Sequence, residues 1–245
     1  MRFVNGEPAL ILNRDTLVIG DVHVGYSEKN EVSRRLNLEE VMLEKLKELH
    51  ERFHLSNLII LGDLKDEILS VPPKVYLFVR ELQEIFSRVI LVKGNHDAGM
   101  EVVKGVEVVP SSGMIFREGN RRIGLIHGHS WPKEEMFNCD YLITAHQHTH
   151  IKMYDKLGKM YMKKVWVIAP VSVDSIKERV SSFNPNLKII ILPAFHPLIY
   201  GVELGKGWKG IGPVLSNELF NIKDGEVYSL EGVYLGRVSR LVSHM

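Results

Sequence analysis

Three short apolar runs, separated by two segments with helical periodicity, dominate the first 92 residues of the chain. The runs cover Thr16–Gly20, Asn57–Leu61 and Arg88–Val92, and each is apolar enough to be buried on both faces. Over residues 38–53 and 72–86, apolar side chains recur every three or four positions with polar residues between them. This alternation predicts a β-α-β-α-β segment whose three strands belong to one central sheet.

From about residue 106 the helical signals give way to shorter strands. The 245 residues can bury one large core, and no low-complexity linker divides them. We expect a single α/β domain over residues 1–245, in which residues 1–150 carry the site motifs and residues 151–245 complete a second sheet and the substrate face. The later strands are expected at Val106–Val109, Met114–Phe116, Arg122–Ile126, Tyr141–Thr144, Lys164–Ile168 and Leu187–Leu192, with a hairpin over Asn221–Tyr228.

The composition excludes several classes of protein. The 31 Lys and Arg against 30 Asp and Glu leave a formal charge of +1, so no overall basic surface indicates nonspecific nucleic-acid binding. The single cysteine, Cys139, cannot close an intramolecular disulfide. No apolar run approaches the roughly 18 residues of a membrane span, and Met1–Leu12 lacks the apolar block of a signal peptide. We therefore expect a cytoplasmic protein that does not contact membranes.

The 11 histidines are the unusual feature of this composition, because histidine is the commonest metal ligand. Most of the informative ones follow predicted strands directly, together with Asp and Asn, and the carboxyl ends of strands form the ligand crevice of an open α/β sheet. Oxygen and imidazole donors without thiolate suit Mn, Fe or Zn. Seven such donors are too many for one tetrahedral ion and about right for two ions. The segments are Asp21-x-His23, Gly62-Asp63-x-x-Asp66, Gly94-Asn95-His96-Asp97, His127-Gly128-His129 and His146-Gln147-His148.

The order of these five blocks resembles the signature of the calcineurin-like metallophosphoesterases, the superfamily that includes the SbcD-type repair nucleases. The stretch Leu192–Leu198, with Gly201, is similar to a segment of the small archaeal and bacterial SbcD-related phosphoesterases. The resemblance implies a four-layer α/β/β/α sandwich with two mixed β-sheets and a dimetal site at the strand carboxyl ends.

The resemblance also implies roles for individual residues. His96 would protonate the leaving oxygen, and Asp66 would orient His96, although a surface-loop carboxylate is the alternative for Asp66. Asp63 would bridge the two ions. The other ligands would be Asp21, His23 and His148 on one ion, and Asn95, His127 and His146 on the other.

Two assignments leave alternatives open. His127 is preferred to His129 because it ends an apolar strand directly, and His129 is then a second-sphere or substrate-facing residue. Ala145 replaces a glycine of the family pattern, and an alanine would be strained if that position required a positive φ. His150 is left outside the site, and His50, His54, His196 and His244 are expected to be structural or exposed.

The resemblance implies a phosphoesterase that hydrolyses phosphodiesters, with DNA or nucleotides as expected substrates, by attack of a hydroxide that bridges two divalent ions. Manganese is the first expectation, with Fe, Zn and Ni as alternatives. The competing functions are a phosphomonoesterase or small-nucleotide hydrolase and a noncatalytic scaffold, and the presence of His96 argues against the scaffold. Homodimerisation and a helicase or ATPase partner are left open. Candidate substrate contacts are Arg34, Arg35, His129 and Trp131, for which a solvated charge pair and a packed indole are the alternatives.

Overall fold

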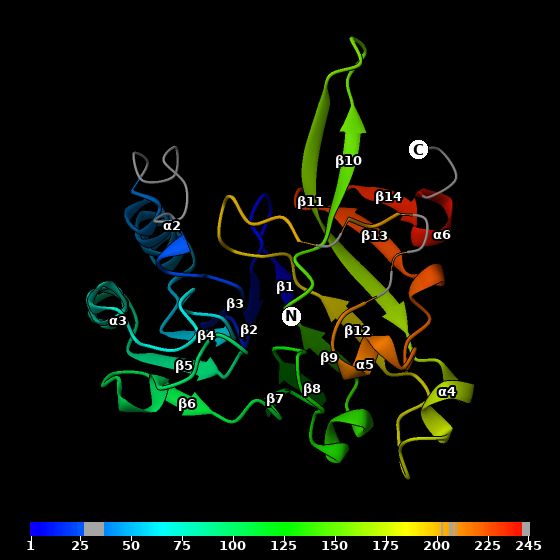
Figure 1. Ribbon diagram of the computed structural model, residues 1–245. Coiled ribbons are helices and arrows are strands. Elements are labelled where there is room, and N and C mark those ends of the chain that lie inside the picture. Colours follow the sequence, from blue (N-terminus) through cyan, green and yellow to red (C-terminus); the bar gives the residue numbers. More distant parts are fainter. Residues whose placement is uncertain (27–36, 202, 206–207, 209, 242–245) are drawn as a thin grey trace.

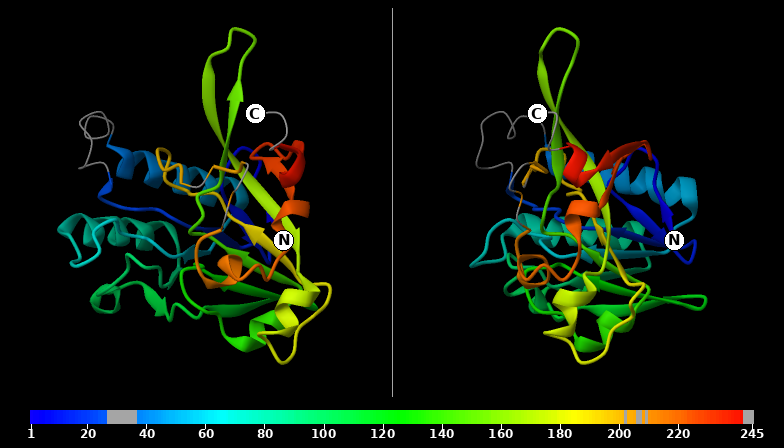
Figure 2. Two further views of the ribbon diagram at one scale, coloured as in Figure 1. Left: turned by 45° about the vertical axis from the view of Figure 1, so that its right-hand side comes forward. Right: turned by 90° about the vertical axis from the view of Figure 1, so that its right-hand side faces the viewer.

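Two β-sheets pack face to face, and helices cover the outer face of each sheet (Figures 1 and 2). The computed structural model describes residues 1–26, 37–201, 203–205, 208 and 210–241. The order of layers is α/β/β/α, which confirms the fold class that the sequence predicts.

The first sheet has six strands in chain order. Its first two pairs of neighbouring strands are antiparallel and its last three pairs are parallel. Its side chains alternate between two cores: Leu17 and Ile19 pack beneath the helices, whereas Val18 enters the layer between the sheets. The strands are β1 (Arg2–Phe3), β2 (Leu10–Leu12), β3 (Thr16–Ile19), β4 (Asn57–Leu61), β5 (Arg88–Val92) and β6 (Glu107–Val109).

Helices α2 (Leu38–Phe53) and α3 (Pro73–Ile85) cover this sheet, at the left of Figure 1. A proline begins α3, where its missing N–H has no helical partner to lose. The buried stripe of α2 repeats every three or four residues, at Leu38, Met42, Leu46 and Leu49.

No helix in the described part of the chain is both long and apolar enough to cross a bilayer.

The second sheet follows the order β14-β13-β11-β12-β9-β8-β7, with β10 paired to the outer part of β11. Strands β8, β9 and β12 are parallel to one another and the remaining pairs are antiparallel. Its strands are β7 (Met114–Glu118), β8 (Arg121–Ile126), β9 (Tyr141–Thr144), β10 (His150–Tyr154), β11 (Met160–Pro170), β12 (Lys188–Ile191), β13 (Glu226–Ser229) and β14 (Tyr234–Arg237).

Short helices complete the fourth layer, and their apolar side chains join the core on the outer face of the second sheet. They are α4 (Val173–Lys177), α5 (Pro213–Ser216) and α6 (Val238–Leu241), with 3-10 turns at Glu134–Asn138 and Ile222–Asp224 and, beside the first sheet, at Met100–Val102.

The predicted strands Asn57–Leu61 and Arg88–Val92 agree with β4 and β5 to the residue. The predicted hairpin over Asn221–Tyr228 is wrong. Residues Ile222–Asp224 form a 3-10 turn, and the hairpin lies later in the chain, between β13 and β14.

Candidate metal centre

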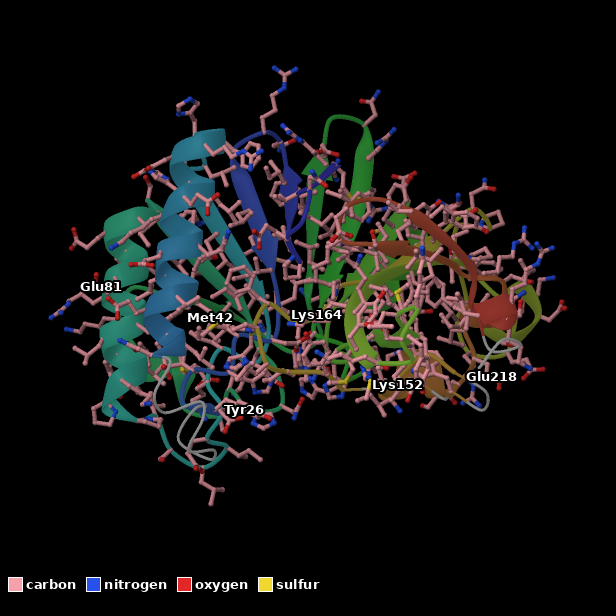
Figure 3. All side chains as sticks on the ribbon, turned by 90° about the horizontal axis from the view of Figure 1, so that it is seen from above. Tyr26, Met42, Glu81, Lys152, Lys164 and Glu218 are labelled. Atoms are coloured by element: carbon pink, nitrogen blue, oxygen red, sulfur yellow. The ribbon has the colours of Figure 1, made fainter. Side chains whose placement is uncertain are left out.

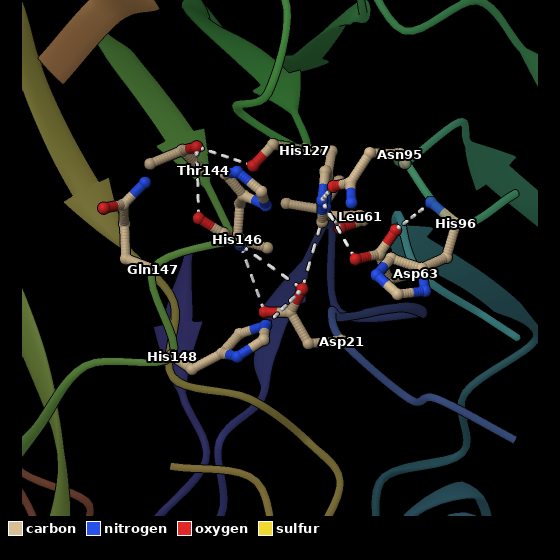
Figure 4. A network of polar contacts seen from close by, with 12 residues as sticks. Asp21, Leu61, Asp63, Asn95, His96, His127, Thr144, His146, Gln147 and His148 are labelled. Atoms are coloured by element: carbon tan, nitrogen blue, oxygen red, sulfur yellow. Dashed lines mark hydrogen bonds and ion pairs between the residues drawn. The ribbon is translucent and has the colours of Figure 1, made fainter. Parts of the chain in front are cut away.

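The predicted ligand residues meet between the two sheets, at the carboxyl ends of five strands (Figure 4). Strands β3, β4 and β5 are parallel neighbours in the first sheet, and β8 and β9 are parallel neighbours in the second, so their carboxyl ends face the same crevice. Both sheets therefore supply side chains to the centre. The loops that follow these strands carry Asp21 and His23, Asp63 and Asp66, Asn95 and His96, His127, and His146 and His148.

Five of the seven predicted ligands have a left-handed backbone conformation. This conformation costs a non-glycine residue about 1–2 kcal/mol, and such strain gathers at functional sites because the surrounding structure holds it there. Ligand placement therefore takes precedence over local backbone preference in these loops. The φ angles are 56° at Asp21, 47° at His23, 51° at Asp63, 67° at His146 and 47° at His148.

Ala145 does not have a positive φ, so the strain considered for an alanine at this position is absent. Its side chain is buried in the layer between the sheets. The left-handed residues are instead its neighbour His146 and, two residues further on, His148. Alanine is thus compatible with the ligand loop after β9.

Two glycines allow the ligand loops to approach closely. A Cβ on Gly62, where φ is +75°, would lie 2.3 Å from Nδ1 of His127. A Cβ on Gly94 would lie 2.2 Å from Oδ1 of Asp63. Both distances are far below van der Waals contact, so any side chain at either position would displace a predicted ligand.

The Asp63 carboxylate lies between two imidazoles. Its Oδ2 is 3.3 Å from Nε2 of His127 and 3.7 Å from Nε2 of His23, and its Oδ1 accepts the backbone N–H of His96 at 2.9 Å. The amide oxygen of Asn95 is 3.0 Å from the same Nε2 of His127. This central position is the one expected of a bridging carboxylate.

Asp21 occupies the other half of the centre. Its Oδ1 is 3.2 Å from Nε2 of His148 and 3.7 Å from Nδ1 of His127, and its carboxylate accepts the backbone N–H of His146 at 3.1 Å. Three sets of potential ligand atoms, each within 4.8 Å of one another, result from this packing: Asp21, His23 and His148; Asp63, His127 and His146; and His23, Asp66 and His96.

The donor set fits divalent cations. Among the described residues, both ring nitrogens of His23 and Nε2 of His148 are buried beside carboxylate oxygens but form no hydrogen bond of good geometry. Burying such groups costs free energy unless something binds them, and imidazole nitrogens beside carboxylates are ligands for Mn, Fe or Zn. The residues present therefore suit the two ions that the sequence predicts.

The electrostatics of the centre also favour cations. Burial opposes ionisation of Asp21 and Asp63, yet the neighbouring imidazoles hold the pKa of both carboxyls below the ordinary value. Burial by itself lowers the pKa of His127, but the hydrogen bond and charge of Asp63 outweigh it and raise that pKa to about 9. Burial and the charge of His127 lower the pKa of His146 to about 4. A positive charge is thus stabilised where Asp63 and His127 meet.

His96 and Asp66 lie together, but their contact is through the backbone of Asp66. Nδ1 of His96 is 2.6 Å from the carbonyl oxygen of Asp66. The carboxylate of Asp66 instead approaches His23, with Oδ1 3.3 Å from Nδ1. Asp66 is thus in contact with both histidines, through different atoms.

The candidate substrate contacts differ in what the structure says of them. The ring of His129 is 5.2 Å from that of His127 and 6.1 Å from that of His146, so His129 borders the centre. Trp131 is 38 % exposed and packs against Phe137 at a ring distance of 5.8 Å. Arg34 and Arg35 lie outside the described residues.

The remaining described histidines have structural surroundings. His50 and His54 lie at the C-terminal end of α2, where Nδ1 of His50 is 2.6 Å from the carbonyl oxygen of Leu55. His150 packs its ring against Tyr200. His196 is buried beside Tyr26, and its Nδ1 accepts the N–H of Leu198 at 3.2 Å.

Asp97 is a residue whose importance the sequence did not reveal. Its buried carboxylate accepts the backbone N–H groups of Asp63 at 2.7 Å, Leu64 at 2.9 Å and Gly94 at 2.8 Å. It therefore ties the loop after β4 to the loop after β5 and fixes the backbone at Asp63, the predicted bridging ligand. Asp97 follows the Asn95-His96 motif directly, but nothing in the sequence shows where its carboxylate points.

The segment Leu192–Gly201, which we call the bracing segment, is hydrogen-bonded to two of the loops that carry predicted ligands, the loop after β3 and the loop after β9. Lys164 of β11 contacts this segment and donates from its buried Nζ to the carbonyl oxygen of Ala194 at 2.8 Å and to that of His196. Burial lowers the pKa of Lys164 to about 7 although the charge of Asp21 opposes this. The bracing amides donate to backbone carbonyls as follows: Leu192 to Thr144 (2.7 Å), Phe195 to Gly20 (2.8 Å), His196 to Asp21 (3.1 Å) and Gly201 to His148 (3.1 Å).

The sequence profile of the calcineurin-like phosphoesterases matches residues 15–214, a range that contains all the predicted ligands. This chain belongs to that family. The calcineurin-like phosphoesterase is accordingly a metal-dependent hydrolase of phosphoesters, as the sequence predicts. No curated protein matches its sequence significantly.

Among solved structures, nuclease MPE from Pseudomonas putida resembles this phosphoesterase with a TM-score of 0.58 at 18 % identity, over 93 % of this chain and 91 % of that chain. YfcE, a phosphoesterase from E. coli, gives 0.44 at 14 % identity, over 91 % and 97 %. The protein AQ665 from Aquifex aeolicus gives 0.40 at 23 % identity, over 54 % and 77 %. At these identities the similarity concerns the fold alone. Of the three structures, only nuclease MPE is similar enough to support the fold assignment.

Proposed function

We propose that this phosphoesterase hydrolyses phosphodiesters, in DNA or nucleotides, with two divalent ions, of which manganese is the first candidate. The observation that carries the proposal is the position of Asp63 between His23 and His127, with a set of ligands on each side. Strands of both sheets carry these predicted ligands, so we treat residues 1–245 as one functional domain.

The ligands divide into two groups that share Asp63. Bound ions would polarise the phosphoryl oxygens and lower the pKa of the attacking water. One group is Asp21, His23 and His148, and the other is Asn95, His127 and His146.

Hydrogen bonds fix which nitrogen of His127 is available for binding. Its Nδ1 is 2.9 Å from the carbonyl oxygen of Leu61, an atom that only accepts hydrogen bonds. Nδ1 therefore donates to this carbonyl, and Nε2, which faces the oxygens of Asp63 and Asn95, is the nitrogen that would bind an ion in place of its proton.

The same reasoning gives His96 its role. Because the Asp66 carbonyl accepts from Nδ1, this nitrogen stays protonated, and Nε2 is the atom that exchanges a proton. In the imidazolium form, Nε2–H donates its proton to the leaving oxygen as the P–O bond breaks. The backbone of Asp66 positions the ring for this transfer.

The two buried lysines near the centre support a diester substrate. Nζ of Lys164 is used by the carbonyls of Ala194 and His196, and Nζ of Lys65 by those of Glu67, Ile68 and His96. A phosphodiester carries one negative charge and a phosphomonoester up to two, so a centre whose two nearby buried lysines are taken up by backbone carbonyls of the described residues suits the diester better.

An assay of substrate preference tests this function. The protein, stripped of metal with a chelator and reloaded with Mn²⁺, should hydrolyse bis-p-nitrophenyl phosphate faster than p-nitrophenyl phosphate, and should cleave single- or double-stranded DNA. Strong monoesterase activity without diesterase activity would contradict the proposal. Activity that survives both chelation and His96→Ala would contradict the catalytic assignment.

A further inference from the structure

The outer parts of β10 and β11 form a two-stranded ribbon that projects from the body of the molecule (Figures 1 and 2). We call residues 150–164 the arm. In the described part of the chain, residues 160–164 of β11 pair with β10 alone, and β11 joins β13 and β12 from Val165 onward. The arm is therefore open to solvent on both faces over most of its length.

The arm carries a short repeated motif. Residues 152–156 read Lys-Met-Tyr-Asp-Lys and residues 159–163 read Lys-Met-Tyr-Met-Lys, on either side of the turn at Leu157-Gly158. Alternate residues of a strand share a face, so β10 presents a row of Lys152 and Tyr154 and β11 a row of Tyr161 and Lys163, while Lys156 and Lys159 lie in the turn that joins the strands. In the register of the ribbon, Tyr154 faces Met160 and Tyr161 faces Met153, which puts the two rows on opposite faces.

The side chains of this motif are exposed. Tyr154 is 62 % and Tyr161 43 % exposed, and Leu157 at the tip is 93 % exposed. Lys156 and Lys159 form no ion pair within the part of the chain that the structure describes. The lysines nearer the base, Lys152 and Lys163, form partly exposed pairs with Glu203 at 2.6 Å and Glu231 at 3.1 Å, and pairs of this kind contribute little stability.

Charge is concentrated on the arm. Apart from the buried Lys164, the arm has four lysines and one aspartate, so residues 150–163 carry a formal charge of +3, whereas the whole chain carries +1 and the remaining residues −2. The near-neutral total therefore conceals a local basic surface. The complementary partner is a polyanion, and exposed aromatic rings between lysines are the combination that binds unpaired bases and phosphates.

The base of the arm adjoins the metal centre. β10 begins at His150, two residues after the ligand His148, and His150 pairs with Lys164, which holds the bracing segment. In Figure 3, which views the molecule from above, Lys164 lies between Tyr26, near the first sheet, and Lys152 of the arm. A strand bound along the arm would thus be led toward the crevice.

We propose that the arm binds single-stranded nucleic acid and directs it to the metal centre. Lysines of the arm contact phosphates, and Tyr154 and Tyr161 stack on bases. The delivery of substrate rests on the proposed phosphodiesterase function, whereas binding by the arm does not depend on it.

Binding of a fluorescein-labelled oligothymidylate to the full chain, measured by anisotropy in chelator so that metal-dependent cleavage is suppressed, tests the proposal. Lys156→Gln/Lys159→Gln should weaken binding. The slope of log K against log salt should fall in magnitude by about 1.4, because each phosphate contact on a single strand contributes about 0.7. The control Lys47→Gln/Lys104→Gln changes the net charge equally at exposed positions away from the arm and should retain the parent slope.

The tyrosines provide a second, charge-neutral test. Tyr154→Ala and Tyr161→Ala should each weaken binding about fivefold or more, while Tyr154→Phe and Tyr161→Phe should retain it. In the presence of Mn²⁺, the alanine variants should also lower kcat/KM for the oligonucleotide relative to that for bis-p-nitrophenyl phosphate.

Three outcomes would overturn the proposal: an unaltered protein that does not bind the oligonucleotide, arm variants that bind as tightly as the lysine control, or arm variants that change the sedimentation of the protein and leave oligonucleotide binding intact. The last would assign the arm to contact with a second copy of the chain. Arm-dependent binding without hydrolysis of any diester would refute the proposed function alone, and diester hydrolysis without arm-dependent binding would refute the arm alone.

Discussion

Nδ1 of His96 lies 2.6 Å from the carbonyl oxygen of Asp66. The contact leaves Nε2 as the nitrogen that transfers a proton, and it does not require the Asp66 carboxylate. His96→Ala should reduce kcat by about 10²–10⁴-fold, and less when the leaving group is weakly basic, because such an oxygen needs no proton. Steady-state kinetics with diesters of differing leaving-group pKa would measure this. His54→Asn, at the exposed end of α2, is the control and tolerates the left-handed backbone there.

Asp97→Ala should destabilise the fold by about 3 kcal/mol or more, because it leaves the buried N–H groups of Asp63, Leu64 and Gly94 without their acceptor. Denaturant unfolding measures the change. The same substitution at the exposed Asp174 should have little effect. Equal stabilities of the two variants would mean that Asp97 does not hold the loops together.

Lys164→Met should alter the pH dependence of stability. The pKa of Lys164 is about 7 in the folded protein and about 10.5 when unfolded, so between these values the unfolded chain binds a proton that the folded chain does not. Lys164 therefore makes the free energy of unfolding rise with pH across this window, by up to about 1.4 kcal/mol per pH unit. Urea unfolding at several pH values should show that Lys164→Met removes this contribution and that Lys47→Met, at an exposed site, keeps it. An unchanged slope in Lys164→Met would refute the assignment.

Gly62→Ala should reduce both stability and metal binding, because its Cβ would lie 2.3 Å from Nδ1 of His127. Gly119 is the matched control: its φ of +58° is also left-handed, but a Cβ there has no atom within 4 Å. Gly119→Ala should cost about 1 kcal/mol from backbone strain alone and leave metal binding intact. Thermal unfolding together with calorimetric metal titration would separate the two effects, and equal losses in both variants would argue against a steric role for Gly62.

The sequence predicts the parts of the fold that local patterns determine. β4 and β5 are buried on both faces and end in Gly-Asp and Lys-Gly-Asn, so apolar content and turn chemistry mark their limits. The arm shows the converse. Its alternating lysines, tyrosines and methionines are exposed on both faces, so no apolar alternation identified β10 or the outer half of β11 as strand.

The same division holds for the centre. The predicted ligands could be found because each follows a strand, and parallel strands end together. The contacts that hold these ligands in place could not be found from the sequence. The carboxylate of Asp97 accepts the backbone N–H of Asp63, 34 residues earlier, and the backbone N–H of His196 donates to the carbonyl oxygen of Asp21 in a separate loop. Such contacts depend on the packing of the two sheets, which residue types and spacing do not specify.

The central claim is that Asp63 joins two metal subsites, and the metal content of the protein tests it most directly. Elemental analysis of the stripped and Mn²⁺-reloaded protein should give two tightly bound ions per chain, with diesterase activity returning as both sites fill, and Asp63→Ala should bind fewer and lose activity. Full diesterase activity with no tightly bound ion or with one, or two ions retained in an active Asp63→Ala variant, would contradict the account.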